Sequence, residues 1–173
     1  MKYPQNIWYY NGKKVLSTWI KTKDVERFQP ITQVYGIIFN KANEILICKQ
    51  KGHKDWNIPG GHPEKGETIE ETLRRELLEE VDVKVENIIP IGVVKGIFPD
   101  EPDSKFLYQV RCVATLKELL PQTPDPDNGK TWERRFIPAE KITEYIKWGQ
   151  MGEAVFKDAI EVWNQTGKLH IFT

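Results

Sequence analysis

The sequence lacks several features that would assign it at once to a common class of protein. It has no net charge, because 25 Lys and Arg residues balance 25 Asp and Glu residues. Balanced charge gives no overall field to attract a nucleic-acid polymer or an anionic membrane. No apolar run approaches the roughly 18–20 residues that cross a bilayer, and the N-terminus does not resemble a signal peptide. We therefore expect a soluble protein with neither nucleic-acid polymers nor membranes as partners.

Cysteine is scarce as well. The two cysteines, Cys48 and Cys112, lie in apolar, strand-like runs, which predicts buried free thiols and favours a reducing cytoplasm. The histidines, His53, His62 and His170, lack the spacing of zinc ligands. There is no Walker loop and no nucleophile-elbow serine. These absences exclude the best-marked phosphate-loop and serine-hydrolase classes.

The 173 residues, 39% of them hydrophobic, suffice for one domain with a core of its own. Asn11-Gly12 joins two aromatic-rich runs and predicts a hairpin over residues 7–20, a candidate lid or dimer arm or simply a cover for a core edge. Further strands are expected at 32–40, 44–50, 81–98, 105–116 and 133–138, and helices at 68–81 and 139–165, the last split near Gly149 and Gly152. This order predicts an α+β fold with a mixed or antiparallel sheet. We expect residues 1–29 to form an N-terminal extension and 30–173 the main domain.

The predicted helix at 68–81 carries an unusual cluster of acidic residues. Its apolar stripe consists of residues four apart, which are Ile69, Leu73, Leu77 and Val81. Around the helix axis, Glu80 lies about 40° and Glu79 about 60° from Glu76, so the three carboxylates border the buried stripe. Like charges at this spacing repel by about 0.2–0.5 kcal/mol per pair, and a cation would relieve the repulsion. Hard oxygens suit Mg²⁺ or Mn²⁺, although a structural salt-bridge network is the alternative.

A glycine pair, Gly60-Gly61, precedes this helix by a few residues. Such a loop lets the backbone approach a ligand closely and offers its N–H and C=O groups. We therefore expect it to form the second wall of a phosphate and metal site.

Residues 61–83 resemble the Nudix box, whose pattern is Gly, five residues, Glu, seven residues, Arg-Glu, an aliphatic, any residue, Glu-Glu, any residue, Gly and an aliphatic. The matching positions are Gly61, Glu67, Arg75, Glu76, Leu77, Glu79, Glu80 and Val83. The one departure is Asp82, which stands where the family has glycine. Glycine adopts a left-handed helix end most easily, so we expect Asp82 to cost about 1 kcal/mol or less.

The resemblance implies the Nudix α/β/α sandwich with a mixed sheet and the hairpin as an extension. It also implies Mg²⁺-dependent hydrolysis, with Mn²⁺ as a substitute ion, of a nucleoside diphosphate linked to another moiety. Nucleoside triphosphates and ADP-ribose or nucleotide-sugar compounds fit equally well. The implied metal ligands are Glu76, Glu79, Glu80 and the carbonyl of Gly60, with Gly61 beside the substrate, and Glu67 paired with Arg75 as support.

The general base is left open between Glu79, Glu80 and Glu133, a glutamate outside the box at the start of the last strand. Trp56, Phe98, Tyr108 and Trp132 are candidate stacking partners for a base. Two other functions are a nucleotide-binding or regulatory domain without turnover and an interaction module that pairs, for example as a homodimer, through the hairpin. The complete set of three glutamates argues against the first of these.

Overall fold

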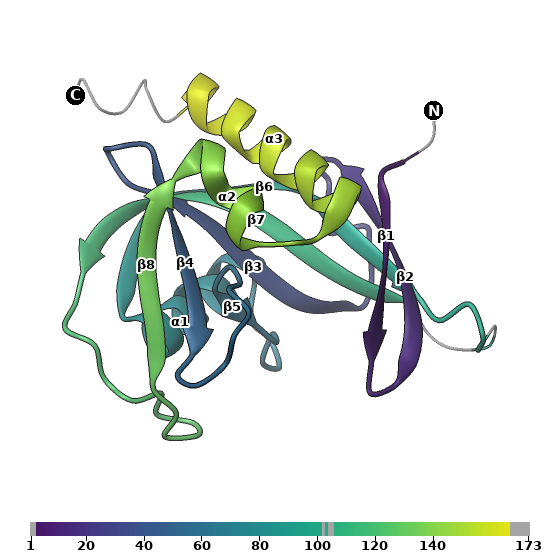
Figure 1. Cartoon of the computed structure of the whole chain (residues 1–173), viewed down its shortest axis with the longest axis horizontal. Coiled ribbons are helices and arrows are strands. Elements are labelled where there is room, and N and C mark those ends of the chain that lie inside the picture. Colours follow the sequence, from purple (N-terminus) through teal and green to yellow (C-terminus); the bar gives the residue numbers. More distant parts are fainter. Residues whose placement is uncertain (1–2, 102, 104–105, 167–173) are drawn as a thin grey trace.

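The structure, a computed structural model, describes residues 3–101, 103 and 106–166, so that His170 and the end of the expected domain 30–173 lie outside it. Within this range eight strands form one sheet in the order β1-β2-β6-β7-β3-β4-β8, with β5 beside β3 (Figure 1). The strands are β1 (Gln5–Tyr10), β2 (Lys13–Lys21), β3 (Ile31–Phe39), β4 (Glu44–Gln50), β5 (Gly60–Gly61), β6 (Val83–Ile97), β7 (Leu107–Leu119) and β8 (Trp132–Pro138). The helices are α1 (Ile69–Val81), a 3-10 turn at Ala139–Lys141, α2 (Ile142–Tyr145) and α3 (Gly149–Thr166).

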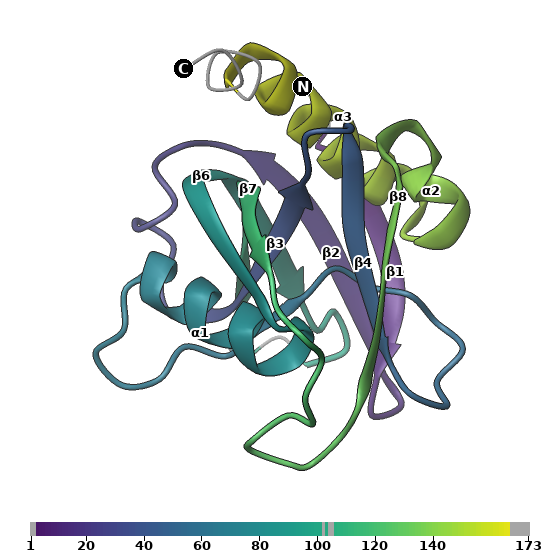
Figure 2. The ribbon, with the colours of Figure 1, turned by 90° about the vertical axis from the view of Figure 1, so that its left-hand side faces the viewer.

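Helices cover both faces of the sheet, with α1 on one side and α3 on the other (Figure 2). The sheet is mixed, because β3 and β7 run parallel while the other neighbouring strands run antiparallel. The predicted α+β fold with an α/β/α arrangement is confirmed.

Strand β3 shows how one sequence supplies both faces. Successive side chains of a strand point to opposite sides, and here Val34 and Ile38 pack with α1 while Ile37 and Phe39 pack in the core under α3. All four side chains are fully buried. Each face therefore has its own hydrophobic core, and β3 belongs to both.

The predicted N-terminal hairpin is present as β1 and β2, and Asn11 and Gly12 both have positive φ, 48° and 77°, at its turn. The hairpin is bound to the rest of the molecule. β2 pairs with β6, and the Trp19 indole donates to Asp158 of α3 at 2.8 Å. Lys21 also forms an ion pair with Asp158 at 2.8 Å. These contacts hold the hairpin against α3 at one edge of the sheet.

Helix α1 begins and ends with specific hydrogen bonds. Thr68 and Glu71 form a capping box at its start, and Asp82 ends it in the left-handed conformation at φ 49°. The carboxylate of Asp82 accepts from the Thr123 N–H at 2.9 Å and from the Thr123 hydroxyl at 2.7 Å. These contacts reverse the expectation that glycine would be slightly more stable here, since glycine would lose both bonds.

The C-terminal helices are separated at Gly149, which has a positive φ of 58°, whereas Gly152 lies inside α3. The predicted break is therefore confirmed at the first glycine only. Among the described residues, no helix combines the length and the apolar character needed to cross a membrane.

Candidate active site

Three glutamates of α1 form what we call the carboxylate edge: Glu76, Glu79 and Glu80. The side chains of Glu76 and Glu79 are 14% and 21% exposed, so they lie at the margin of the core as their helical spacing predicts. The buried residues Leu73, Leu77 and Val81 orient the helix. This edge faces β5, the short strand of the glycine pair.

The space around β5 requires glycine at position 60 and leaves little room at Gly61. Gly60 has a φ of 144°, and a Cβ there would lie 2.2 Å from the carbonyl oxygen of Val34. A Cβ on Gly61 would lie 2.5 Å from the carboxylate of Glu76. The N–H of Gly60 donates to Glu80 Oε2 at 2.9 Å. The backbone of β5 therefore lies directly against the carboxylate edge.

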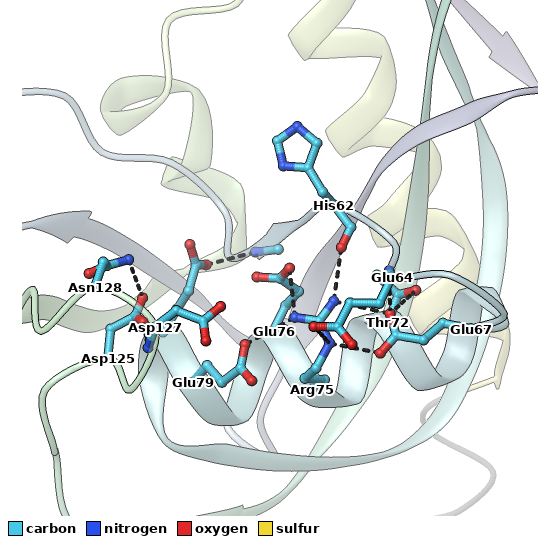
Figure 3. Close-up of polar contacts among 12 residues, drawn as sticks. His62, Glu64, Glu67, Thr72, Arg75, Glu76, Glu79, Asp125, Asp127 and Asn128 are labelled. Carbon is cyan, nitrogen blue, oxygen red and sulfur yellow. Dashed lines mark hydrogen bonds and ion pairs between the residues drawn. The ribbon is translucent and has the colours of Figure 1, made fainter.

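Arg75 connects the glutamates of this site (Figure 3). Its Nη1 donates to Glu76 Oε1 and Glu79 Oε2, both at 3.0 Å. Its Nε donates to Glu67 at 2.7 Å, and its Nη2 donates to the carbonyl of His62 at 2.8 Å. The pairing of Glu67 with Arg75 is present, and one guanidinium ties the loop after β5 to two of the three glutamates.

Burial and neighbouring charge shift the pKa values of these carboxyl groups in opposite directions. Desolvation, added to by Glu76, raises the pKa of Glu80 to about 8, and burial also raises the pKa of Glu76. By contrast, the hydrogen bonds from Arg75 lower the pKa of Glu67 to about 2. Arg75 therefore neutralises the outer part of the cluster, whereas Glu80, which forms no ion pair among the described residues, keeps its proton up to a pH of about 8.

The donor set fits a divalent cation. Three carboxylates within about one helical turn, beside an exposed peptide backbone, are the hard oxygen ligands that Mg²⁺ and Mn²⁺ take. In the part of the chain that is described, no three His, Cys, Asp or Glu side chains converge on a single point, and Arg75 bridges Glu76 and Glu79 instead. Ion binding would therefore require these side chains to turn away from Arg75.

A loop at residues 121–131 adds acidic residues that the sequence did not assign to the site. Asp125 is buried and accepts from the N–H of Asp127 at 2.9 Å and from the Asn128 amide at 3.0 Å. The charge of Asp125 contributes to the raised pKa of Glu80. The only sequence signal is the Pro- and Asp-rich composition of this loop, which is also typical of an ordinary turn.

Glu133 lies on the opposite face of the sheet from α1. Its neighbour Arg134 donates to the carbonyl of Val81 at 2.6 Å, and alternation along β8 turns Glu133 the other way. There its carboxylate is 3.5 Å from Lys49 Nζ. Its role as a base stays a prediction.

A pocket of about 700 Å³ lies on the α3 side of the sheet beside the hairpin, and we call it the hairpin pocket. Its walls include Trp8, Phe98 and Trp148, its floor Gln33, Tyr35, Gln109 and Arg111, and His62 links it to the carboxylate edge. Of the four predicted stacking residues, Phe98 lines it. Tyr108 and Trp132 pack in the core with α1, and Trp56 carries Lys49 and Arg135 over its ring.

Comparisons with known proteins agree with this geometry. An RNA pyrophosphohydrolase of Pseudoalteromonas atlantica is 36% identical over 73 residues, which is 42% of this chain and 41% of that protein. The chain spans less than half the length of the curated relatives it matches, 41%, 48% and 43% for three of them.

Two solved structures are similar. The Bacillus subtilis pyrophosphohydrolase BsRppH has a TM-score of 0.67 at 17% identity over 94% of this chain and 98% of that one, which shows the fold alone. A MutT structure from work on Aliivibrio salmonicida and Vibrio cholerae has a TM-score of 0.54 at 27% identity, covering 76% and 97%. A family model described as the NUDIX domain matches residues 30–157, so the resemblance of residues 61–83 extends over most of the sequence and the chain belongs to the Nudix family.

Proposed function

We propose that this protein is a metal-dependent pyrophosphohydrolase that cleaves a phosphoanhydride bond of a small nucleotide. One observation carries the proposal: the carboxylate edge lies against the backbone of Gly60 and Gly61, where a Cβ on Gly60 would meet the Val34 carbonyl and a Cβ on Gly61 would displace the Glu76 carboxylate. This arrangement gives a diphosphate a backbone on one side and clustered carboxylates on the other. The pyrophosphohydrolase name of the relative from Pseudoalteromonas atlantica supports the same reaction class.

The ion would be Mg²⁺, with Mn²⁺ as a substitute, and Glu76, Glu79, Glu80 and the carbonyl of Gly60 would hold it. When bound, it supplies neutralisation of charge on the phosphate oxygens. The residues of the chain provide the positioning. Glu67 holds Arg75, and Arg75 fixes the distance between α1 and the loop after β5. Water attacks one phosphorus in line, the bond from that phosphorus to the bridging oxygen breaks, and the bridging oxygen leaves with the other phosphate. The proton of the water passes to Glu79, Glu80 or Glu133.

The substrate we propose is a nucleoside triphosphate or a nucleotide-sugar diphosphate. The hairpin pocket, which adjoins the carboxylate edge through His62, is the volume for the remainder of such a molecule. The relative from Pseudoalteromonas atlantica acts, by its name, on RNA. Because this chain has no net charge to attract a polymer, small nucleotides are favoured, and an RNA bearing a 5′-triphosphate belongs in the test.

A nucleotide-binding domain without turnover is the second candidate. Such a domain would have no need of three carboxylates that repel one another, and repulsion from Glu76 and Glu79 adds to burial in raising the pKa of Glu80. We therefore favour the enzyme.

Two further proposals concern the setting of the protein. Cys48 and Cys112 are buried free thiols, as predicted, which supports a reducing cytoplasm. β1 is an edge strand with Ile7, Tyr9 and Tyr10 more than half exposed, which supports the hairpin as a dimer contact. Size-exclusion chromatography with light scattering of the wild type and of Tyr9→Glu would test the dimer.

The test of function is a substrate panel. Nucleoside triphosphates, nucleotide sugars, ADP-ribose and a 5′-triphosphate RNA are incubated with Mg²⁺, with Mn²⁺ and with EDTA, and the phosphate products are identified. Release of pyrophosphate or of two monophosphates that depends on the ion is expected. Absence of turnover for every compound, with binding retained, would favour the non-catalytic domain.

A further inference from the structure

Arg111 of β7, on the floor of the hairpin pocket, is a buried cation without a counter-charge. It is 3% exposed. Of the ion pairs formed by residues in the described ranges, none involves Arg111, and its Nε has no hydrogen-bond partner. Burial lowers its pKa to about 10. A guanidinium held this way is expensive to bury unless something that enters the pocket accepts its hydrogen bonds.

Two aromatic rings lie next to the Arg111 guanidinium. The guanidinium carbon lies 4.6 Å from the centre of the Tyr35 ring and 5.4 Å from the centre of the Trp148 ring. These distances fit cation–π contacts of the guanidinium with both rings. Nη1 donates to the carbonyl of Val110 at 3.4 Å, whereas Nε has no partner. Nε and the remaining N–H groups of the guanidinium therefore suit a ligand that presents hydrogen-bond acceptors.

Hydrogen bonds fix the orientation of the two neighbouring side-chain amides, those of Gln109 and Gln33. Arginine can only donate, so its Nη2 contacts the oxygen of the Gln109 amide, Oε1, at 3.0 Å. The amide nitrogen of Gln109 then donates to Gln33 Oε1. This series of hydrogen bonds leaves Gln33 Nε2 as a donor with no acceptor among the residues that the structure describes. The floor of the pocket therefore presents donors, from Arg111 and from Gln33.

The register of the sheet sets the distance from the carboxylate edge. Gly60 pairs with Tyr35, and Tyr35 pairs with Arg111. Two strand spacings, about 10 Å, thus separate the backbones of Gly60 and Arg111. A ribose carrying a base can bridge this gap when its phosphates lie against Gly60 and Gly61.

We propose that Arg111 is a specificity-determining residue that binds the O6 and N7 acceptor edge of a 6-oxopurine, so that the protein prefers guanine and hypoxanthine nucleotides to adenine nucleotides. Arginine forms paired hydrogen bonds with O6 and N7 of guanine, whereas adenine presents an amino donor in place of O6. This inference rests on the proposed nucleotide substrate and names its base.

A phosphate group is the competing partner for an unpaired arginine, and the pocket suits it poorly. About half of the residues that line the pocket are aromatic or apolar, with Trp8, Phe98, Met151 and Trp148 among them, and Lys147 is the only lysine among the described residues of the lining. The Trp8 indole is held in place by a hydrogen bond to Ser17 Oγ at 2.6 Å. Fixed rings beside a planar donor suit a base far better than a compact, multiply charged group.

The test measures binding of GMP, IMP, AMP and 7-deaza-GMP by quenching of tryptophan fluorescence, without metal and without turnover. We expect GMP and IMP to bind roughly 10- to 100-fold more tightly than AMP, as a paired arginine contact discriminates. IMP keeps O6 and N7 but lacks the 2-amino group, so it isolates the proposed edge. 7-Deaza-GMP lacks N7 and should bind more weakly than GMP. These comparisons need no variant of the protein.

Variants then assign the preference to Arg111. Arg111→Lys keeps the charge but loses the planar donors, and together with Arg111→Gln it should reduce GMP and IMP binding to the level of AMP while AMP binding stays unchanged. Arg27→Lys is the matched control, because Arg27 is exposed and also stacks on an aromatic ring, that of Phe28, outside the pocket. It should leave all four affinities unchanged.

Two results would overturn the assignment. Equal affinity of the wild type for GMP, IMP and AMP would show that no 6-oxopurine edge is selected. Equal loss of GMP, AMP and inorganic pyrophosphate binding in Arg111→Gln would show that Arg111 binds phosphate. Because binding is measured without hydrolysis, a guanine preference with no turnover would refute the proposed reaction and leave this inference intact. Turnover without a base preference would support the proposed reaction and refute this inference.

Discussion

The carboxylate edge and the hairpin pocket lie on the two sides of strand β3 and carry charge of opposite sign. At the carboxylate edge, Arg75 contacts Glu76 and Glu79, and Glu80 is left with only a backbone N–H. In the pocket, Arg111 has aromatic rings and amides around it and no acid among the described residues. A bound cation would offset the carboxylates of the carboxylate edge, and a ligand with hydrogen-bond acceptors would suit Arg111 in the hairpin pocket. The unbalanced charge of each site therefore indicates its proposed partner: the metal ion and phosphates at the carboxylate edge, and the base in the hairpin pocket.

The largest expected effect comes from substitutions that disable the carboxylate edge and leave the hairpin pocket intact. Glu79→Gln and Glu80→Gln should each lower turnover by about 100-fold or more, since each removes a carboxylate from the proposed metal and base set. Nucleotide binding in the hairpin pocket should change little. Turnover is measured by phosphate release with Mg²⁺, and binding by fluorescence.

Glu70→Gln is the control for this pair, because Glu70 is 57% exposed on the same helix and pairs with Arg74. Near-normal turnover in both Glu79→Gln and Glu80→Gln would refute the metal site. Loss of nucleotide binding together with turnover would show that the two places are not separable.

The next effect concerns the arginine of the carboxylate edge. Arg75→Lys keeps a positive charge but cannot contact Glu67, Glu76, Glu79 and the His62 carbonyl at once. Residues that orient metal ligands typically contribute 10–100-fold, and we expect a loss of about that size in kcat. Arg74→Lys, one residue away on the outer face, should be nearly neutral in the same assay. An unchanged kcat in Arg75→Lys would mean that the network has no positioning role.

A smaller effect is a dependence of stability on pH and metal. The pKa of Glu80 rises from its usual 4.5 to about 8 on folding, so the folded state binds the proton more tightly. Below pH 4.5 both states are protonated, and as the pH rises through this window to about 8 the metal-free protein loses stability. The thermal midpoint in EDTA should fall accordingly, and Mg²⁺ should restore it near pH 8.

Glu80→Gln removes the titrating group and is the control for this measurement. Its thermal midpoint should vary less with pH and respond less to Mg²⁺ than that of the wild type. A wild-type midpoint in EDTA that rises over the same pH range would contradict the proposed state of Glu80.

The smallest effect is at the end of α1. Asp82→Gly should lower the free energy of unfolding by about 1–2 kcal/mol, because two hydrogen bonds to Thr123 outweigh the easier backbone of glycine. Urea denaturation measures it, and Thr123→Val tests the same contacts from the other side. Greater stability of Asp82→Gly would show that the strain of the left-handed backbone outweighs the two hydrogen bonds.

Local features of this chain could be predicted from the sequence, and features that depend on distant contacts could not. The hairpin turn at Asn11-Gly12 and the margin position of Glu76, Glu79 and Glu80 follow from neighbours in the chain. Arg111 lies in an apolar strand pattern and has no local sign of its missing partner. Its character depends on Tyr35 and Trp148, which are 76 and 37 residues away in the sequence.

Asp82 shows the same limit at the site itself. The motif identifies it as a departure from the family, but its bonds to Thr123 come from a loop 41 residues further on. The same loop brings Asp125 near Glu80. The sequence therefore predicts which residues form the carboxylate edge, whereas the residues that surround it are set by tertiary contacts with distant parts of the chain.

The alternation of side chains along β3 limits which insertions and deletions this strand can tolerate. Its consecutive residues Val34 and Tyr35 face the α1 core and the hairpin pocket respectively, and Tyr35 also pairs with Gly60. Inserting or deleting one residue within β3 would exchange the two faces, moving an aromatic ring into the core and an aliphatic chain into the pocket. Substitutions around the pocket rim can therefore change what the pocket accepts, whereas a change in the length of β3 would disturb the pocket and the carboxylate edge together.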